Sequence, residues 1–197
     1  MRSDYIDRKT AQAVFSRMQP VNRLICEICA NTGLRIDDVC ALRTRDVKQA
    51  KQKSGWLVLT EQKTGKRKKL RLRYKDIDRM LWQAGSVYIF PNRDNETKHR
   101  TRQTVWRDLA RSAKPLRQQG LVISPHSLRK LYAVEQFDKH GDLAKVQRQL
   151  NHDNINTTLL YVMSRELQKT KTSKKSNAAR GCKPAVAVVS LKKKIER

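Results

Sequence analysis

The chain has 197 residues, with 44 Lys and Arg against 18 Asp and Glu, so its formal net charge is +26. This length suits one domain with a core of its own, which needs neither a disulfide nor a metal for stability. No apolar stretch approaches the roughly 20 residues that cross a bilayer. So large a positive charge attracts polyanions, so nucleic acid is the expected partner and an anionic membrane surface is the weaker interpretation.

Helical patterns open the chain. Residues 10–18 and 21–30 are predicted helices. Residues 31–33 follow the second one, and Gly33 there suits a helix stop followed by a tight turn. Residues 36–42 follow as a short helix with acidic side chains in its first turn, where they suit the helix dipole.

A small antiparallel sheet is predicted next. Residues 55–60 and 69–73 have strand patterns, and Lys63-Thr64-Gly65-Lys66 between them is typical of a hairpin turn. Residues 46–49 are the candidate for a third, edge strand. The expected fold class is therefore α+β, mainly helical, with a small three-stranded antiparallel sheet.

Helices resume after the sheet and continue to residue 163. They are predicted at residues 75–82, 101–113, 125–139, 143–150 and 157–163. From residue 164 onward the composition changes to 11 Lys and Arg against 2 Glu, with a β-prone run at residues 185–189. We therefore expect one domain over residues 1–163 and a basic C-terminal tail over residues 164–197.

The four cysteines indicate a cellular compartment rather than a site. Cys26 and Cys29 form a C-x-x-C pair, but they lie within an apolar helical run, and Cys40 and Cys182 add no pair with zinc-finger spacing. We interpret them as buried free thiols, which suit a reducing cytoplasm.

The stretch from Ser124 to Arg129 carries the clearest chemistry. Ser124 is a good helix N-cap and Pro125 suits the first helical position, so His126 and Arg129 are expected on one face of a first turn. Backbone N–H groups and the helix dipole favour an anion there. A histidine that exchanges protons near neutral pH, beside a guanidinium, suits phosphoryl transfer, although such a pair is more often an ordinary surface pair.

A second group consists of His152 and Tyr161, which are nine residues apart. On one unbroken helix they would face opposite ways. Residues 153–156 are rich in turn and cap residues, so we predict a helix break that brings both side chains to one site. A tyrosine phenol is a poor nucleophile unless its neighbours help to remove the proton.

Two further basic residues precede these. Arg35 is expected on the turn that follows Gly33, where Asp38 either orients it or packs as a local ion pair. Lys63 is expected at the tip of the hairpin, where a lysine is usually solvated.

In this order the motifs resemble the tyrosine recombinases, particularly the phage and conjugative-element integrases of bacteria. The resemblance covers about residues 10–163 and rests on Thr-Gly-Leu-Arg, Lys-Thr-Gly, His-Ser-Leu-Arg-Lys, and Leu-Asn-His followed by Thr-Thr-x-x-Tyr. It implies a site-specific DNA recombinase that works without a metal or other cofactor. The catalytic residues that it implies are Arg35, Lys63, His126, Arg129, His152 and the nucleophile Tyr161.

The resemblance also implies a role for each residue. Tyr161 would attack a phosphodiester to give a 3′-phosphotyrosyl link, while the two arginines stabilise the phosphoryl oxygens. Lys63, or Lys66 close by, would protonate the leaving 5′-oxygen. His126 would accept the tyrosine proton or hold a phosphate oxygen, and His152 would donate a hydrogen bond to the phosphate.

Two departures from the family pattern matter. Asn151 stands where the family usually has glycine, and because asparagine tolerates left-handed backbone we expect the turn to survive. About 30 residues precede Arg35, too few for the usual N-terminal domain, so we expect either a short form with the catalytic domain only or a piece of a longer recombinase.

The resemblance further implies a homotetramer on double-stranded DNA, in the cytoplasm of a bacterial host and associated with its nucleoid. The run at residues 185–189 then has two interpretations, a strand that docks on a neighbouring subunit or part of a disordered tail that contacts DNA. Two other activities stay open, a type IB topoisomerase that relaxes DNA and a catalytically inactive DNA-binding regulator.

Overall fold

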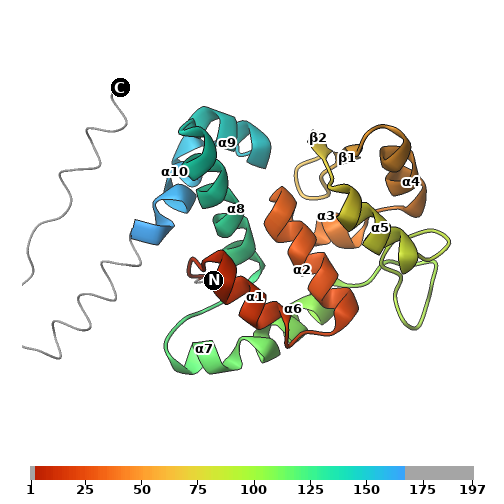
Figure 1. The fold of residues 1–197 in the computed structure, drawn as a ribbon, viewed down its shortest axis with the longest axis horizontal. Coiled ribbons are helices and arrows are strands. Elements are labelled where there is room, and N and C mark those ends of the chain that lie inside the picture. The colour runs from red at the N-terminus through yellow and green to blue at the C-terminus, as the bar shows by residue number, and fades with distance from the viewer. Residues whose placement is uncertain (1–2, 167–197) are drawn as a thin grey trace, which may run out of the picture. The chain divides into compact units, whose positions relative to one another are not determined.

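The structure is a computed structural model that describes residues 3–166, and residues 3–164 of these belong to one compact unit. Of the basic tail expected over residues 164–197, residues 167–197, with the run at 185–189, lie outside the described residues. Ten helices and two strands make up the described part (Figure 1). No helix among the described residues is long and apolar enough to cross a membrane.

The N-terminal helices supply most of the core. They are α1 (Arg8–Phe15), α2 (Pro20–Thr32), α3 (Ile36–Cys40) and α4 (Thr44–Gln52). In α2 the apolar and small side chains are buried nearly all round, as expected for a central helix. It packs against α8 (Pro125–His140), α3 and α6 (Arg102–Ser112). The predicted helices in this part are confirmed to within a few residues at their ends.

The sheet has two described strands rather than three. Strand β1 (Trp56–Thr60) pairs antiparallel with β2 (Arg67–Arg71), with Leu57 opposite Leu70. The prediction of an edge strand at residues 46–49 was wrong, because these residues form the middle of α4. Val47 and Ala50 are both buried there, and a spacing of three is the period of a helix, not of a strand.

After the hairpin the chain returns to helices: α5 (Tyr74–Trp82), α6, α7 (Lys114–Gln118), α8, α9 (Leu143–Leu150) and α10 (Ile155–Val162). Helices α8, α9 and α10 pack against one another, so α9 and α10 lie beside α8 (Figure 1). A small core of Ala133, Val146 and Leu150 joins them, and Tyr161 packs against it. This packing fixes where the Tyr161 side chain can lie.

Candidate active site

Helix α8 begins as its sequence predicts. The Ser124 hydroxyl accepts a hydrogen bond from the backbone N–H of His126, and the Ser127 hydroxyl accepts one from the backbone N–H of Ser124. Pro125 occupies the first helical position. This capping box fixes the first turn, so the His126 and Arg129 side chains leave the helix from a rigid base.

Arg129 joins three motifs that are far apart in the sequence. Its buried guanidinium donates hydrogen bonds to the backbone carbonyls of Gly33, at the end of α2, and of Leu150, at the end of α9. Burial, together with the nearby charge of Arg35, lowers the pKa of Arg129 to about 10. The guanidinium therefore remains charged at neutral pH. It holds the ends of α2 and α9 against α8, the helix that carries Arg129.

Arg35 enters the site from the turn after Gly33. Its Nη1 donates to Oε2 of Glu61 at 2.6 Å, and Thr64 donates to the same carboxylate oxygen at 2.8 Å. Burial raises the pKa of Glu61, but these hydrogen bonds outweigh it and lower the pKa overall. The partner of Arg35 is therefore Glu61, which the sequence did not suggest.

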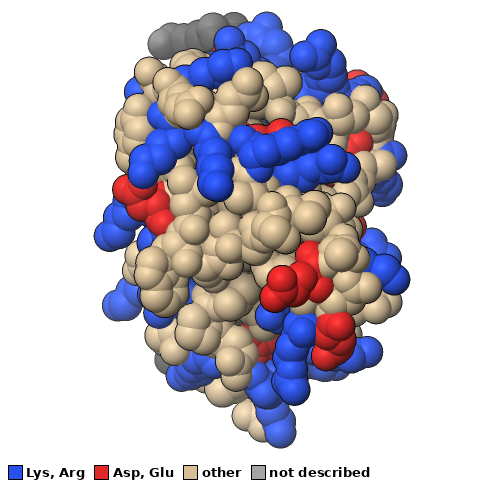
Figure 2. Space-filling view, turned by 90° about the vertical axis from the view of Figure 1, so that its right-hand side faces the viewer, with Lys and Arg blue, Asp and Glu red and all other residues tan. Residues whose placement is uncertain are grey.

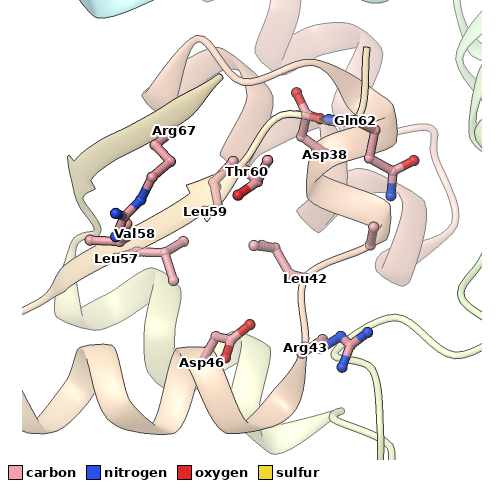
Figure 3. A pocket seen from close by; sticks show the side chains of 11 residues that line it. Asp38, Leu42, Arg43, Asp46, Leu57, Val58, Leu59, Thr60, Gln62 and Arg67 are labelled. Atoms are coloured by element: carbon pink, nitrogen blue, oxygen red, sulfur yellow. Dashed lines mark hydrogen bonds between the residues drawn. The ribbon is translucent and has the colours of Figure 1, made fainter. Parts of the chain in front are cut away.

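Asp38 has a different role from the one expected. Its Oδ1 accepts a hydrogen bond from the backbone N–H of Gln62, so it holds the end of β1 rather than pairing directly with Arg35. Burial raises the pKa of Asp38. Asp38 and Gln62 also border a separate hollow of about 480 Å³ between α3, α4 and β1, whose floor includes Leu42 and Leu57 (Figure 3).

The hairpin between β1 and β2 places two lysines differently. Lys63 lines a cavity of about 460 Å³ together with Arg35, His126 and Arg129. Lys66 forms an ion pair with Asp153, the residue after His152. Gly65 has a φ of 66°, the left-handed conformation that the turn requires and that glycine adopts without strain.

Tyr161 reaches the start of α8 from α10. Its hydroxyl oxygen lies 3.4 Å from Nδ1 of His126, and its ring meets the His152 ring edge-on, with 5.1 Å between centroids. The Nζ of Lys130 lies 5.9 Å from the centroid of the Tyr161 ring. The predicted helix break is confirmed, because α9 ends at Leu150 and α10 begins at Ile155.

At the break the backbone turns at Asn151. Asn151 has φ 51° and ψ 40°, so it adopts the left-handed conformation expected where the family usually has glycine. Gln147 donates to the backbone carbonyl of His152 at 3.0 Å and so holds the turn from the preceding helix. The His152 Nδ1 then lies 2.9 Å from the Thr158 hydroxyl, which orients the ring.

Both histidines lie in a strongly positive environment. Burial and the charge of Arg129 lower the pKa of His152 to about 4. Burial and the neighbouring Arg129 and Lys63 also lower the pKa of His126. Both rings are therefore neutral at pH 7, which leaves each with one N–H donor and one nitrogen acceptor.

Part of the cavity wall was not predicted from the sequence. Arg102 and Trp106 from α6 line it beside Ile36 and Pro125, and Arg102 donates to Asp37 at 3.2 Å. Trp106 is 41% exposed, although it is a large apolar side chain. The period of α6 marks which residues face the core, but it carries no information on which outer residues lie near Arg35.

All six expected residues therefore lie in one region. Arg35, Lys63, His126 and Arg129 line the cavity, while Tyr161 contacts both histidines. On one face of the molecule a band of Lys and Arg side chains crosses the upper part, at the level of α4 and the hairpin (Figure 2). The arrangement combines a phenol, two neutral imidazoles and several fixed cations around a space that suits a phosphate.

Comparison with known proteins agrees with this geometry. The family model described as "Phage integrase family" matches residues 5–168, most of the chain. The chain belongs to the phage integrase family. A curated relative, tyrosine recombinase XerA of Pyrococcus furiosus, is 28% identical over 146 residues, which are 71% of this chain and 49% of XerA.

Solved structures of the same family share the fold of this integrase-family chain. It superposes on a lambda integrase dimer bound to a COC′ core site with a TM-score of 0.66 at 21% identity, covering 84% of this chain and 49% of that one. A lambda integrase tetramer bound to a Holliday junction gives 0.64 at 20% identity, covering 82% and 48%. The chain spans about half the length of the relatives that it matches.

Proposed function

We propose that this chain is a site-specific DNA recombinase that cuts and rejoins DNA through a covalent bond to Tyr161. The observation that carries the proposal is the Tyr161 hydroxyl, 3.4 Å from His126 and beside a cavity lined by Arg35, Lys63 and Arg129. A tyrosine beside an imidazole that can accept its proton, next to fixed guanidinium groups, suits attack on a phosphodiester.

In the proposed cleavage step these side chains account for every bond and proton that moves. The Tyr161 oxygen attacks the phosphorus, its proton passes to His126, and the bond from phosphorus to the 5′-oxygen breaks. Arg35 and Arg129 stabilise the charge on the phosphoryl oxygens, and His152 donates its free N–H to one of them. The product is a 3′-phosphotyrosine and a 5′-hydroxyl. Attack by a 5′-hydroxyl on this link reverses the step and rejoins DNA without ATP.

The leaving 5′-oxygen needs a proton, and Lys63 is the donor that the geometry favours. Lys63 lines the same cavity as the arginines, whereas Lys66 is paired with Asp153. The exposed position of Lys63 on a hairpin lets its flexible side chain reach the DNA. The expectation that no metal or cofactor takes part stays a prediction.

The partner that we propose is double-stranded DNA, held by a homotetramer. The net charge of +26 and the similarity of the fold to a lambda integrase tetramer on a Holliday junction support this assembly. We also propose that residues 1–163 are the catalytic domain and residues 164–197 a basic tail that adds to DNA binding. Cys26, Cys29 and Cys40 are buried free thiols, which supports a location in the bacterial cytoplasm.

A covalent-trapping assay tests the activity. The protein is incubated with supercoiled plasmid and with a library of randomised duplexes, denatured, and analysed for protein that stays linked to DNA. We expect an adduct on a 3′-phosphate with the wild-type chain and none with Tyr161→Phe. The control variant is Tyr74→Phe, which removes an exposed phenol from α5 and should leave the adduct unchanged.

The same assay separates the rival activities. Relaxation of the plasmid by a monomer, without exchange between two sites, would indicate a type IB topoisomerase. A chain that binds DNA equally well before and after Tyr161→Phe, and never forms the adduct, would be a binding regulator. Either result would contradict the proposed recombinase.

A further inference from the structure

One charged residue faces the inside of the hairpin. In β1 and β2 alternate positions are buried, and Lys68 takes such a position in β2, directly opposite Leu59. Its neighbour Lys69 points outward and lies over the Trp56 ring. Lys68 is only 5% exposed, at a place where the strand pattern would normally have an apolar side chain.

The buried ammonium group of Lys68 and two buried carboxylate oxygens lack hydrogen bonds. Within the described residues, Nζ of Lys68, Oδ2 of Asp38 and Oε1 of Glu61 are all buried and have no hydrogen-bond partner. The lysine Nζ is a positively charged donor, and the two carboxylate oxygens are negatively charged acceptors. Asp38 follows Arg35 by one helical turn, and Glu61 is the direct partner of Arg35. The charges of Asp38, Glu61 and Arg35 all act on Lys68, so Lys68 and the two carboxylates lie near one another and near the proposed catalytic arginine.

Burying the charged group of Lys68 does not by itself stabilise the fold. Burial and the charge of Arg129 together lower the pKa of Lys68 to about 8, although Glu61 and Asp38 act to raise it. Replacing buried charged groups by apolar ones of similar volume is often neutral or stabilising. A contribution to stability therefore does not explain the charge at this position, while its place next to Arg35 does.

We propose that Lys68 is a positioning residue for the cleavage reaction, which neutralises Asp38 and Glu61 so that Arg35 keeps its positive charge directed at the DNA phosphate. The inference rests on the proposed function and extends it to a residue outside the six that the sequence motifs indicate. Lys68 itself does not touch the DNA, because its ammonium group is buried.

The balance of charges explains the effect. The groups that act on Lys68 are Arg35, Asp38 from α3, Glu61 from the end of β1 and Arg129 from α8, and Lys68 in turn lowers the pKa of His152. With Lys68 charged, three cations face two carboxylates and one positive charge remains for the phosphate. With Lys68 neutral, the carboxylates balance the two arginines and draw the Arg35 guanidinium towards themselves.

The test measures single-turnover formation of the Tyr161 adduct on one duplex selected by trapping. The variants are Lys68→Met, which keeps the volume without the charge, and Lys68→Arg, which keeps a charge. Lys69→Met is the matched control, since it removes a lysine from the next position on the same strand. Thermal unfolding and DNA binding of each variant are measured in parallel.

We expect Lys68→Met to slow cleavage by roughly 10- to 100-fold, the range seen when a group that supports a primary ligand is removed. DNA affinity should fall no more than with Lys69→Met, and thermal stability should stay equal or rise. Lys68→Arg should recover a substantial part of the rate. In the wild type the rate should fall between pH 7.5 and 9.5 as Lys68 loses its proton, and this fall should be absent from Lys68→Met.

Three outcomes would overturn the inference. The first is a Lys68→Met rate equal to that of the wild type with the same alkaline fall. The second is a loss that appears in DNA affinity instead of cleavage, and the third is an equal loss in Lys68→Arg and Lys68→Met. In all three the wild type still forms its adduct, so the proposed function stands. A wild type that forms no adduct on any duplex would overturn both.

Discussion

At the scale of single residues, the two histidines next to Tyr161 are kept neutral by their surroundings. The pKa of His152 is lowered to about 4, and that of His126 is lowered too. A neutral imidazole can accept a proton from Tyr161, whereas an imidazolium cannot. The positive charges that suit a phosphate thus also keep His126, the proton acceptor that we propose, in its neutral form.

The lowered pKa values predict how stability depends on pH. In the unfolded chain a histidine takes up a proton near pH 6.5, while folded His152 stays neutral down to about pH 4. The unfolded state therefore binds more protons in this window, so stability falls as the pH is lowered from 7 to 5. Urea unfolding at several pH values should show this fall, and His152→Gln should make it smaller. A pH dependence that is unchanged in His152→Gln would contradict the prediction.

The sequence predicts some of these residues and not others. His126 and Arg129 follow from a helix start with a clear cap, and His152 and Tyr161 from the cap-rich segment between them. Lys68 could not be predicted, because a lysine in a strand is normally on the exposed face. Its burial depends on which face of the hairpin packs against the rest of the chain, and this is a property of the tertiary structure.

At the scale of elements, left-handed residues at two helix ends shape the site. Gly33 ends α2 with a φ of 66°, and Asn151 ends α9 with a φ of 51°. Each is directly followed by a short segment that delivers a site residue, Arg35 in one case and His152 in the other. Glycine and asparagine are recognisable in the sequence, which is why both turns were predicted correctly.

Substitution of Gly33 tests how closely α2 and α8 pack. A Cβ there would lie 2.5 Å from the Tyr132 ring and 2.9 Å from Leu150, in addition to the strain of a positive φ. We expect Gly33→Ala to lower the free energy of unfolding by at least about 1–3 kcal/mol, measured by urea denaturation. Gly141→Ala is the control, because Gly141 ends α8 at nearly the same φ but faces open space. Equal losses in both variants would show that backbone strain alone is responsible.

Helix α4 shows where the sequence pattern was misleading. The stretch at residues 46–49 is too short for its period to be read, and the adjacent strand favoured a strand there. The structure instead has a helix from Thr44 to Gln52 that packs on β1 and α5. Only the wider spacing of Thr44, Val47 and Ala50, all buried, distinguishes the two possibilities.

At the scale of the whole molecule, the charge of +26 determines how DNA binding responds to salt. Each phosphate contact releases counterions, and six to ten contacts lower the affinity by about 10³- to 10⁵-fold between 50 and 200 mM salt. We expect a loss of this order for nonspecific duplex DNA, measured by fluorescence anisotropy. A loss of less than about tenfold would show that the basic surface is not the DNA-binding surface.

The contacts of Arg129 link distant parts of the chain, since its partners Gly33 and Leu150 are 96 and 21 residues away in sequence. Tyr161 comes later still, on the last described helix. During synthesis on the ribosome, helices α2 to α8, with Arg35, Lys63 and Arg129, therefore emerge before the proposed nucleophile Tyr161. If Tyr161 is the nucleophile that we propose, a growing chain carries most of its positive charge before it carries the group that cuts DNA.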